Sequence, residues 1–117
     1  MRVMIVAILA MTASGAIAGE LEDAHRLALQ GRDSYWNCLA REYSRDVTQA
    51  MSEQDFTRDI ASVCRSERQN FRVTLVDYLS MQFPDTEAGA HMTTANKAIE
   101  LAQKDIVTAF ARHRAPK

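Results

Sequence analysis

The residues best suited to covalent chemistry in this chain are its two cysteines, Cys38 and Cys64. Such a pair can form a structural disulfide, act as a reactive dithiol or bind a metal ion. A reactive dithiol usually has its cysteines close together, as in Cys-x-x-Cys, and that spacing is absent. A metal site requires more soft ligands than two cysteines on neighbouring helices. The structural disulfide is therefore the preferred interpretation.

The positions of the cysteines also favour a disulfide. Each lies thirteen residues from Met51, where we expect a turn between two helices. In an antiparallel hairpin both cysteines would lie about 20 Å from that turn, and therefore level with each other. Closing a loop of this size stabilises a fold by roughly 3–3.5 kcal/mol in the chain-entropy model. The sequence thus predicts a bond between Cys38 and Cys64 within one chain.

The three histidines are the other candidates for metal or haem ligation. Glu22 and His25 have the Glu-x-x-His spacing of di-iron bundles, which need a second such motif and two further glutamates. Near His91 the sequence offers only Glu87, at a different spacing, and the adjacent Met92 cannot reach the opposite face of a haem. Haem-attachment and nucleophile-elbow motifs are also missing. We expect no metal, no cofactor and no enzyme activity; a metal- or haem-binding bundle is kept as an alternative.

Four arginines recur on one side of the predicted second helix: Arg58, Arg65, Arg68 and Arg72. Arg65, Arg68 and Arg72 lie at positions i, i+3 and i+7, which places them on one side of a helix. They form either an ordinary solvated face or a surface for an anionic partner. If this region binds a partner, we expect Trp36 and Phe71 to contribute to the same surface. The simpler interpretation of these two aromatic residues is that they belong to the core.

A charged pair is predicted from the antiparallel packing of the first two helices. Arg32 and Glu67 both fall on apolar stripes, and the level set by the cysteines places Arg32 near residue 70. A partly buried ion pair between them would specify the register of the helices more than it would stabilise them.

The first eighteen residues have the features of a secretory signal peptide. Arg2 is followed by an apolar run over residues 3–11 and by an Ala-x-Ala motif that ends at Ala18. The run is shorter than the roughly 20 residues of a spanning helix, and no second apolar run follows. We therefore expect cleavage after Ala18, a mature chain of residues 19–117 that is periplasmic or secreted, and no stable membrane insertion.

The charge of the mature chain is close to balanced. Removal of Arg2 leaves 13 basic residues against 15 acidic ones, a net charge of −2 with the histidines neutral. This balance does not produce the basic footprint of a nucleic-acid-binding protein. We therefore expect no nucleic-acid partner.

Apolar residues recur at helical spacing through the mature chain, and strand-like alternation is absent. The spacing predicts helices over about residues 21–50, 53–83 and 93–113. The fold class is therefore all-α: a small three-helix, up-down-up bundle in a single domain, with the disulfide joining its first two helices. Whether the bundle is a monomer or a homodimer stays open.

Particular residues set the expected helix ends. Gly31 marks a bend or break in the first helix, whose apolar stripe includes Val47. Ser52 suits the N-cap of the second helix, and Pro84 ends it. Thr93 or Thr94 is expected to cap the third helix, unless that helix is split near Gly89.

A resemblance to a known family rests on a short set of residues around the cysteines: Trp36-Asn37-Cys38, Cys64 and Gln69-Asn70-Phe71-Arg72. They resemble the two-cysteine framework of HdeA-type periplasmic acid-stress chaperones, which are exported helical proteins with one disulfide. The resemblance implies a dimer that is inactive near neutral pH and partly unfolds in acid to bind unfolding clients. It further implies that Trp36 and Phe71 bind clients while the disulfide keeps a tether. The chain departs from the family because its cysteines lie closer together.

The sequence therefore predicts a non-enzymatic, exported helical protein with a protein-binding or chaperone-like role in the cell envelope. Its partner or client is expected to be a protein of unspecified identity. A secreted inhibitor that docks into a target enzyme is the main alternative.

Overall fold

The computed structural model describes the backbone of residues 4–114 and the side chains of residues 18–87 and 89–114. Within that part of the chain all regular structure is helical, which confirms the all-α class. The helices are α1 (Met4–Tyr43), α2 (Asp46–Gln49), α3 (Glu53–Ser62), α4 (Arg65–Gln82) and α5 (Ala88–Arg114). Five helices thus stand where three were predicted.

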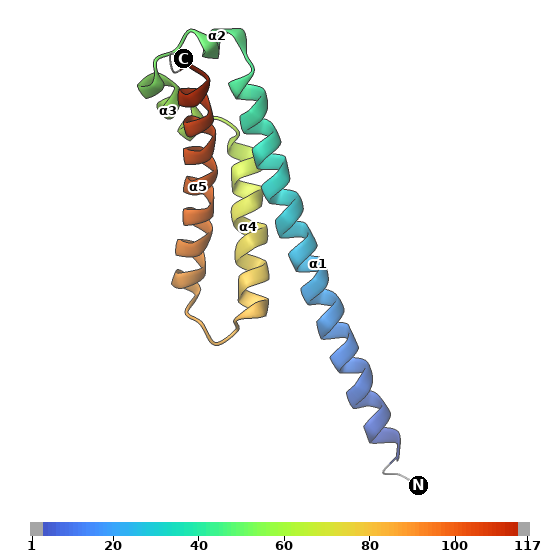
Figure 1. Cartoon of the computed structure of the whole chain (residues 1–117). Coiled ribbons are helices and arrows are strands. Elements are labelled where there is room, and N and C mark those ends of the chain that lie inside the picture. The colour runs from blue at the N-terminus through green and yellow to red at the C-terminus, as the bar shows by residue number, and fades with distance from the viewer. Residues whose placement is uncertain (1–3, 115–117) are drawn as a thin grey trace.

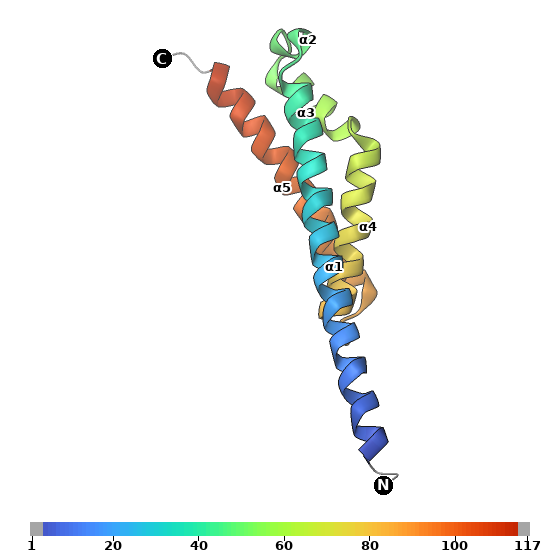
Figure 2. The ribbon, with the colours of Figure 1, turned by 90° about the vertical axis from the view of Figure 1, so that its right-hand side faces the viewer.

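Three long helices, α1, α4 and α5, run side by side, with α4 antiparallel to the other two (Figure 1). Helix α4 packs extensively against α1 on one side and against α5 on another. Helix α3 lies at one end and packs on α5, while α2 lies in the turn that follows α1. Figure 2 shows that α5 is tilted relative to α1 and α4. The molecule is elongated, with extents of 78 × 27 × 25 Å, because the first turns of α1 project beyond the other helices (Figure 1).

The core lies where α1, α3, α4 and α5 meet. Its buried side chains come from the apolar stripes expected from helical spacing: Tyr35, Leu39, Phe56, Ile60, Phe71, Ile99, Ala102, Ile106 and Phe110. The rings of Phe56 and Phe110 stack with their centroids 4.0 Å apart, which fixes α3 against α5. Tyr43 at the end of α1 packs its ring edge-on against both. This aromatic cluster closes the end of the bundle that holds α3.

The first helix ends earlier than predicted. It stops at Tyr43, whose carbonyl accepts a hydrogen bond of 2.8 Å from the Gln49 side chain. The short α2 then begins in a new helical phase. As a result Thr48 is fully buried, and Val47, which was assigned to the apolar stripe, is 54% exposed. The predicted helix to residue 50 is therefore wrong over its last turns.

Gly31 does not bend or break α1, which is continuous through this position. Glycine is needed there because α1 approaches α4 closely. A Cβ atom at Gly31 would lie 2.8 Å from the Thr74 hydroxyl oxygen and 3.1 Å from the backbone Cα of Phe71. Gly31 therefore allows α1 and α4 to pack closely and does not change the direction of α1.

The predicted second helix is divided in two. Ser52 caps α3 as expected, accepting a hydrogen bond of 3.1 Å from the Asp55 amide. The helix is interrupted at Val63 and Cys64, and Cys64 has left-handed backbone angles (φ 59°, ψ 41°). The chain restarts as α4 at Arg65 and runs to Gln82.

The third helix begins at Ala88, five residues before the predicted start, and is not split at Gly89. The hydroxyls of Thr93 and Thr94 donate to the carbonyls of Gly89 and Ala90 inside the helix, so neither threonine is an N-cap.

The predicted signal peptide falls largely outside the described side chains. Its first three residues lie outside the described backbone, and residues 4–18 form the projecting turns of α1. A search of the described helices finds none with the length and apolar character needed to cross a membrane. The signal peptide stays a prediction.

We predict that Gly31→Ala destabilises the fold by about 1 kcal/mol. Overpacking typically costs ~1–3 kcal/mol, and the better helix propensity of alanine offsets roughly 1 kcal/mol of that cost. The measurement is urea unfolding followed by circular dichroism.

Gly89→Ala is the matched control, because the nearest atom to its added Cβ is a flexible Glu87 carboxylate oxygen at 3.9 Å. That variant should be as stable as the wild type or slightly more stable. Equal stability of the two alanine variants would contradict close packing at Gly31.

Candidate anion-binding site between α4 and α5

The disulfide holds the start of α4 against the C-terminal end of α1. Cys38 and Cys64 are bonded with their Cα atoms 6.0 Å apart, which confirms the predicted pairing. A left-handed residue other than glycine costs about 1–2 kcal/mol, less than the roughly 3.5 kcal/mol expected from closing a loop of 26 residues. The bond can therefore hold Cys64 in a conformation that ends α3 and starts α4 in a new direction.

Arg68 stabilises this break with its backbone and its side chain. Its amide donates to the Cys64 carbonyl at 2.8 Å, which forms the first turn of α4. Its guanidinium donates to the carbonyl of Ala61 in the last turn of α3. A cationic side chain is favoured there because the C-terminal end of a helix carries partial negative charge. Arg68 is consequently held at the junction of the two helices.

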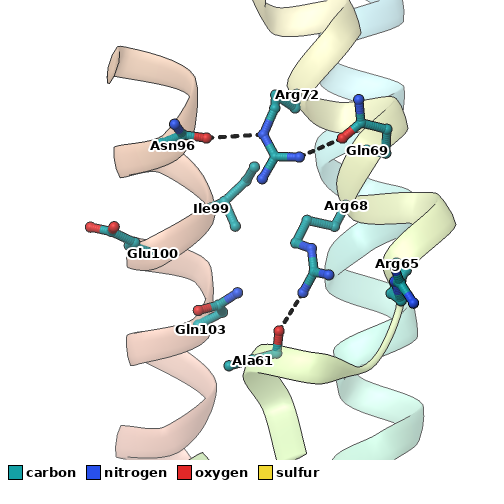
Figure 3. Close-up of a pocket in the computed structure, with 9 residues that line it drawn as sticks. All are labelled: Ala61, Arg65, Arg68, Gln69, Arg72, Asn96, Ile99, Glu100 and Gln103. Atoms are coloured by element: carbon teal, nitrogen blue, oxygen red, sulfur yellow. Dashed lines mark hydrogen bonds between the residues drawn. The ribbon is translucent and has the colours of Figure 1, made fainter. Parts of the chain in front are cut away.

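Arg72 links α4 to α5 one turn further along. Its Nε–H donates to the Asn96 amide oxygen at 2.9 Å, and its guanidinium also donates to the Gln69 amide oxygen (Figure 3). Both acceptors are neutral, so they orient the guanidinium without cancelling its charge. The remaining N–H groups of Arg72 stay available to another acceptor.

These side chains surround an open pocket of about 730 Å³ between the first half of α4 and the middle of α5. We call it the arginine pocket, and its lining residues are Ala61, Arg65, Arg68, Gln69, Arg72, Asn96, Ile99, Glu100 and Gln103. Three guanidinium groups and one carboxylate line it, so its lining carries net positive charge. Such a set of donors suits a carboxylate or phosphate group, because the guanidinium fork can donate two parallel hydrogen bonds to either.

The pocket arginines differ in their partners from four other arginines of the described chain. Ion pairs within the described residues join Arg26 to Asp23, Arg32 to Asp33, Arg45 to Glu42 and Arg58 to Asp55. None of the pocket arginines has a carboxylate partner in that part of the chain. Arg41, Arg112 and Arg114 are also in no ion pair there, so the pocket is distinguished by the three such guanidinium groups that line one cavity.

The structure brings together only some of the residues predicted to form a partner surface. Arg65, Arg68 and Arg72 all line the arginine pocket. Phe71 does not, because it lies on the inward face of α4 and is 5% exposed in the core. Trp36 is partly buried on α1, where it packs against the same core. Neither aromatic side chain lines the arginine pocket, and their burial agrees with the simpler interpretation that they belong to the core.

The predicted buried pair of Arg32 and Glu67 does not form. Arg32 follows Gly31, which faces α4, so helical rotation turns the arginine away from that interface. Its side chain is half exposed and pairs with Asp33 at 3.1 Å.

Glu67 lies instead beside the disulfide. Its carboxylate and the sulfurs of Cys38 and Cys64 lie within 4.8 Å of one another, and they form the one group of three potential metal ligands found in the described residues. Both sulfurs are already bonded to each other and cannot act as thiolate ligands. In the oxidised protein this cluster is therefore a structural contact.

Sequence reasoning missed the contribution of α5 to the pocket. Asn96, Ile99, Glu100 and Gln103 lie at positions i, i+3, i+4 and i+7, which is the spacing of a single helix face. That mainly polar face beside the apolar stripe was the signal that could have revealed it. Its pairing with the arginines could not be read from spacing alone, because it depends on the tilt of α5 against α4.

Comparison with models of known families, with curated proteins and with solved structures finds no match to this chain. The resemblance to HdeA-type chaperones stays a prediction.

One titratable pair lies at the contact between α1 and α3. Glu42 is 11% exposed, and burial raises the pKa of its carboxyl above the ordinary value of 4.5; the neighbouring carboxylate of Asp59 raises it further. Arg45, 2.7 Å from Glu42, opposes that rise. Asp59 Oδ2 is buried with no hydrogen-bond partner among the described residues. Two carboxylates share a hydrogen bond only when one is protonated, so a proton on Glu42 would satisfy the pair.

We predict that Glu42→Gln is more stable than the wild type at pH 7, by a margin that shrinks towards pH 4. In the wild type, a raised folded-state pKa gives stability that is complete below pH 4.5 and is lost as the pH rises through the folded-state pKa. Glutamine stays neutral and avoids this loss. Thermal unfolding at a series of pH values measures the difference.

Glu87→Gln, at an exposed position in the loop before α5, controls for removing a negative charge in general. If Glu42→Gln instead unfolds at a lower temperature than the wild type at pH 7, the ion pair with Arg45 outweighs the effects of burial and of Asp59. The prediction would then be wrong.

Proposed function

We propose that this protein is an exported, non-enzymatic binding protein that recognises an acidic segment of a protein partner. The observation that carries the proposal is the arginine pocket, in which Arg65, Arg68 and Arg72 have no carboxylate partner in the described part of the chain. An acidic segment would supply the missing carboxylates. A target enzyme with an acidic surface is one such partner, so the inhibitor alternative belongs to the same class.

Preorganisation of the guanidinium groups supports this role. Arg68 and Arg72 already make hydrogen bonds to protein groups, so binding fixes few additional rotatable bonds. The packed helices around them supply a rigid frame, and we propose that α1, α4 and α5 act as a single up-down-up bundle. Arg65, at the exposed rim, has no hydrogen bond from its side chain in the described structure and is the most adaptable of the three.

Export is part of the proposal. The sequence pattern of residues 1–18 and the disulfide both suit an oxidising compartment. Intact-mass measurement of exported protein tests whether the chain begins at Gly19.

A chaperone-like role is supported by a different observation, the exposure of large apolar side chains on the folded protein. Leu27, Val73, Phe83, Met92 and Leu101 are each 43–59% exposed. Loosening in acid would have to come from carboxylates other than Glu42, since protonation of that residue favours the folded state. Protection of an aggregating client at acid pH, with no protection at neutral pH, would favour this second function.

We predict that a short glutamate-rich peptide binds the purified, disulfide-bonded protein and that Arg65→Gln weakens binding about tenfold. Loss of one charge-assisted hydrogen-bonding group typically costs about 1.5 kcal/mol, and ~1.4 kcal/mol is a factor of ten. Fluorescence anisotropy of a labelled peptide gives the Kd. Affinity should fall as salt is raised, because the charges are accessible to solvent.

Arg58→Gln is the matched control, because Arg58 is exposed on α3 and already paired with Asp55. Inorganic phosphate serves as a competitor. Equal weakening by both substitutions would show that binding follows overall charge, and binding of phosphate without the peptide would rule out a protein partner at this site.

A further inference from the structure

A second groove lies on the other side of α4, where that helix packs against the middle of α1. It has a volume of about 460 Å³ and is lined by Glu20, Asp23, Ala24, Leu27, Thr74, Asp77, Ser80 and Met81. The four lining residues of α1 have the spacing i, i+3, i+4 and i+7. On α4, Thr74, Asp77 and Met81 have the spacing i, i+3 and i+7. Two helical faces therefore form the walls, and the groove runs along both helices for about 10 Å, or two helical turns.

The floor of this groove is apolar and open to solvent. Leu27 from α1 is 46% exposed and Met81 from α4 is 40% exposed, while Ala24 between them is buried. The small alanine leaves room between the two larger side chains. Exposed leucine and methionine that face a common groove provide a surface for another apolar side chain.

The rim of the groove is acidic. Glu20, Asp23 and Asp77 contribute carboxylates, and no lysine or arginine lines the groove. Asp23 pairs with Arg26 at 3.3 Å, but both side chains are largely exposed, so this ion pair is weak. Glu20 and Asp77 are in no ion pair within the described residues.

We propose that this groove binds a basic amphipathic helix of a partner protein. A helix with apolar residues at i, i+4 and i+7 would place them against Leu27 and Met81, and flanking lysines or arginines would meet the acidic rim. An acidic segment would be repelled here. The groove and the arginine pocket thus select ligands of opposite charge, and this site stands independently of the function proposed for the arginine pocket.

The test uses a labelled synthetic helix with three leucines at i, i+4 and i+7 flanked by lysines, and an otherwise identical peptide in which glutamates replace the lysines. Anisotropy titrations on the purified, disulfide-bonded protein should show saturable binding of the lysine peptide and at least tenfold weaker binding of the glutamate peptide. Excess glutamate-rich competitor for the arginine pocket should leave the lysine peptide bound. Equal affinity for the two helical peptides, or no binding of the lysine peptide, would overturn the proposal.

Variants then locate the site. Leu27→Ser should weaken the lysine peptide about tenfold, as expected for an apolar anchor. The Glu20→Gln, Asp77→Asn double variant should weaken it and reduce the dependence of Kd on salt. Leu101→Ser, at a 59% exposed apolar position on α5, is the matched control and should leave the Kd unchanged.

Sedimentation of the wild type and of Leu27→Ser distinguishes a partner from a second copy of this chain. A monomer in both cases is the expected result. If the wild type dimerises and Leu27→Ser does not, the occupant is a second copy and the proposal is wrong.

Discussion

The Cys38–Cys64 disulfide joins the C-terminal end of α1 to the residue that immediately precedes α4. The bond fixes the register of α1 against α4. Gly31 therefore faces Phe71, because Gly31 lies seven residues before Cys38 and Phe71 lies seven residues after Cys64. It also accommodates the left-handed turn at Cys64, which separates α3 from α4. Because Arg68 bridges that turn to the end of α3, the shape of the arginine pocket depends on the same bond.

Much of this arrangement follows from the sequence. The cysteine positions predict the disulfide, and the apolar spacing predicts most of the core, since tight packing along α1, α4 and α5 leaves little freedom at those positions. The break at Val63 and Cys64 could not be predicted, because neither residue is a glycine or proline and the turn depends on a tertiary bond. The role of Gly31 was also inaccessible: its effect on helix propensity is local, whereas its close approach to α4 is a property of the assembled fold.

The candidate site was predictable only in part, for a related reason. Spacing placed the three arginines on one side of a helix, and the structure places them in one pocket. Phe71 is adjacent to Arg72 but is turned roughly 100° from it around the helix, and its side chain lies in the core. Its helical spacing from the other core residues indicates this position. The arginine pocket is positively charged, and the groove between α1 and α4 is acidic. These opposite charges depend on which faces of α1 and α5 pack against α4, and those faces are set by helix tilt and rotation. A chain with nearly balanced overall charge thus carries two locally charged surfaces.

We propose that the three pocket arginines bind an anionic segment as a group. NMR spectroscopy that resolves the arginine Nε–H signals tests it most directly, during titration of the disulfide-bonded protein with a glutamate-rich peptide. Binding as a group predicts saturable shifts of the Arg65, Arg68 and Arg72 signals with a common Kd, while the ion-paired Arg26 and Arg58 do not respond. Small, non-saturating shifts spread over all arginines would contradict it, because they would show general charge attraction without a defined site.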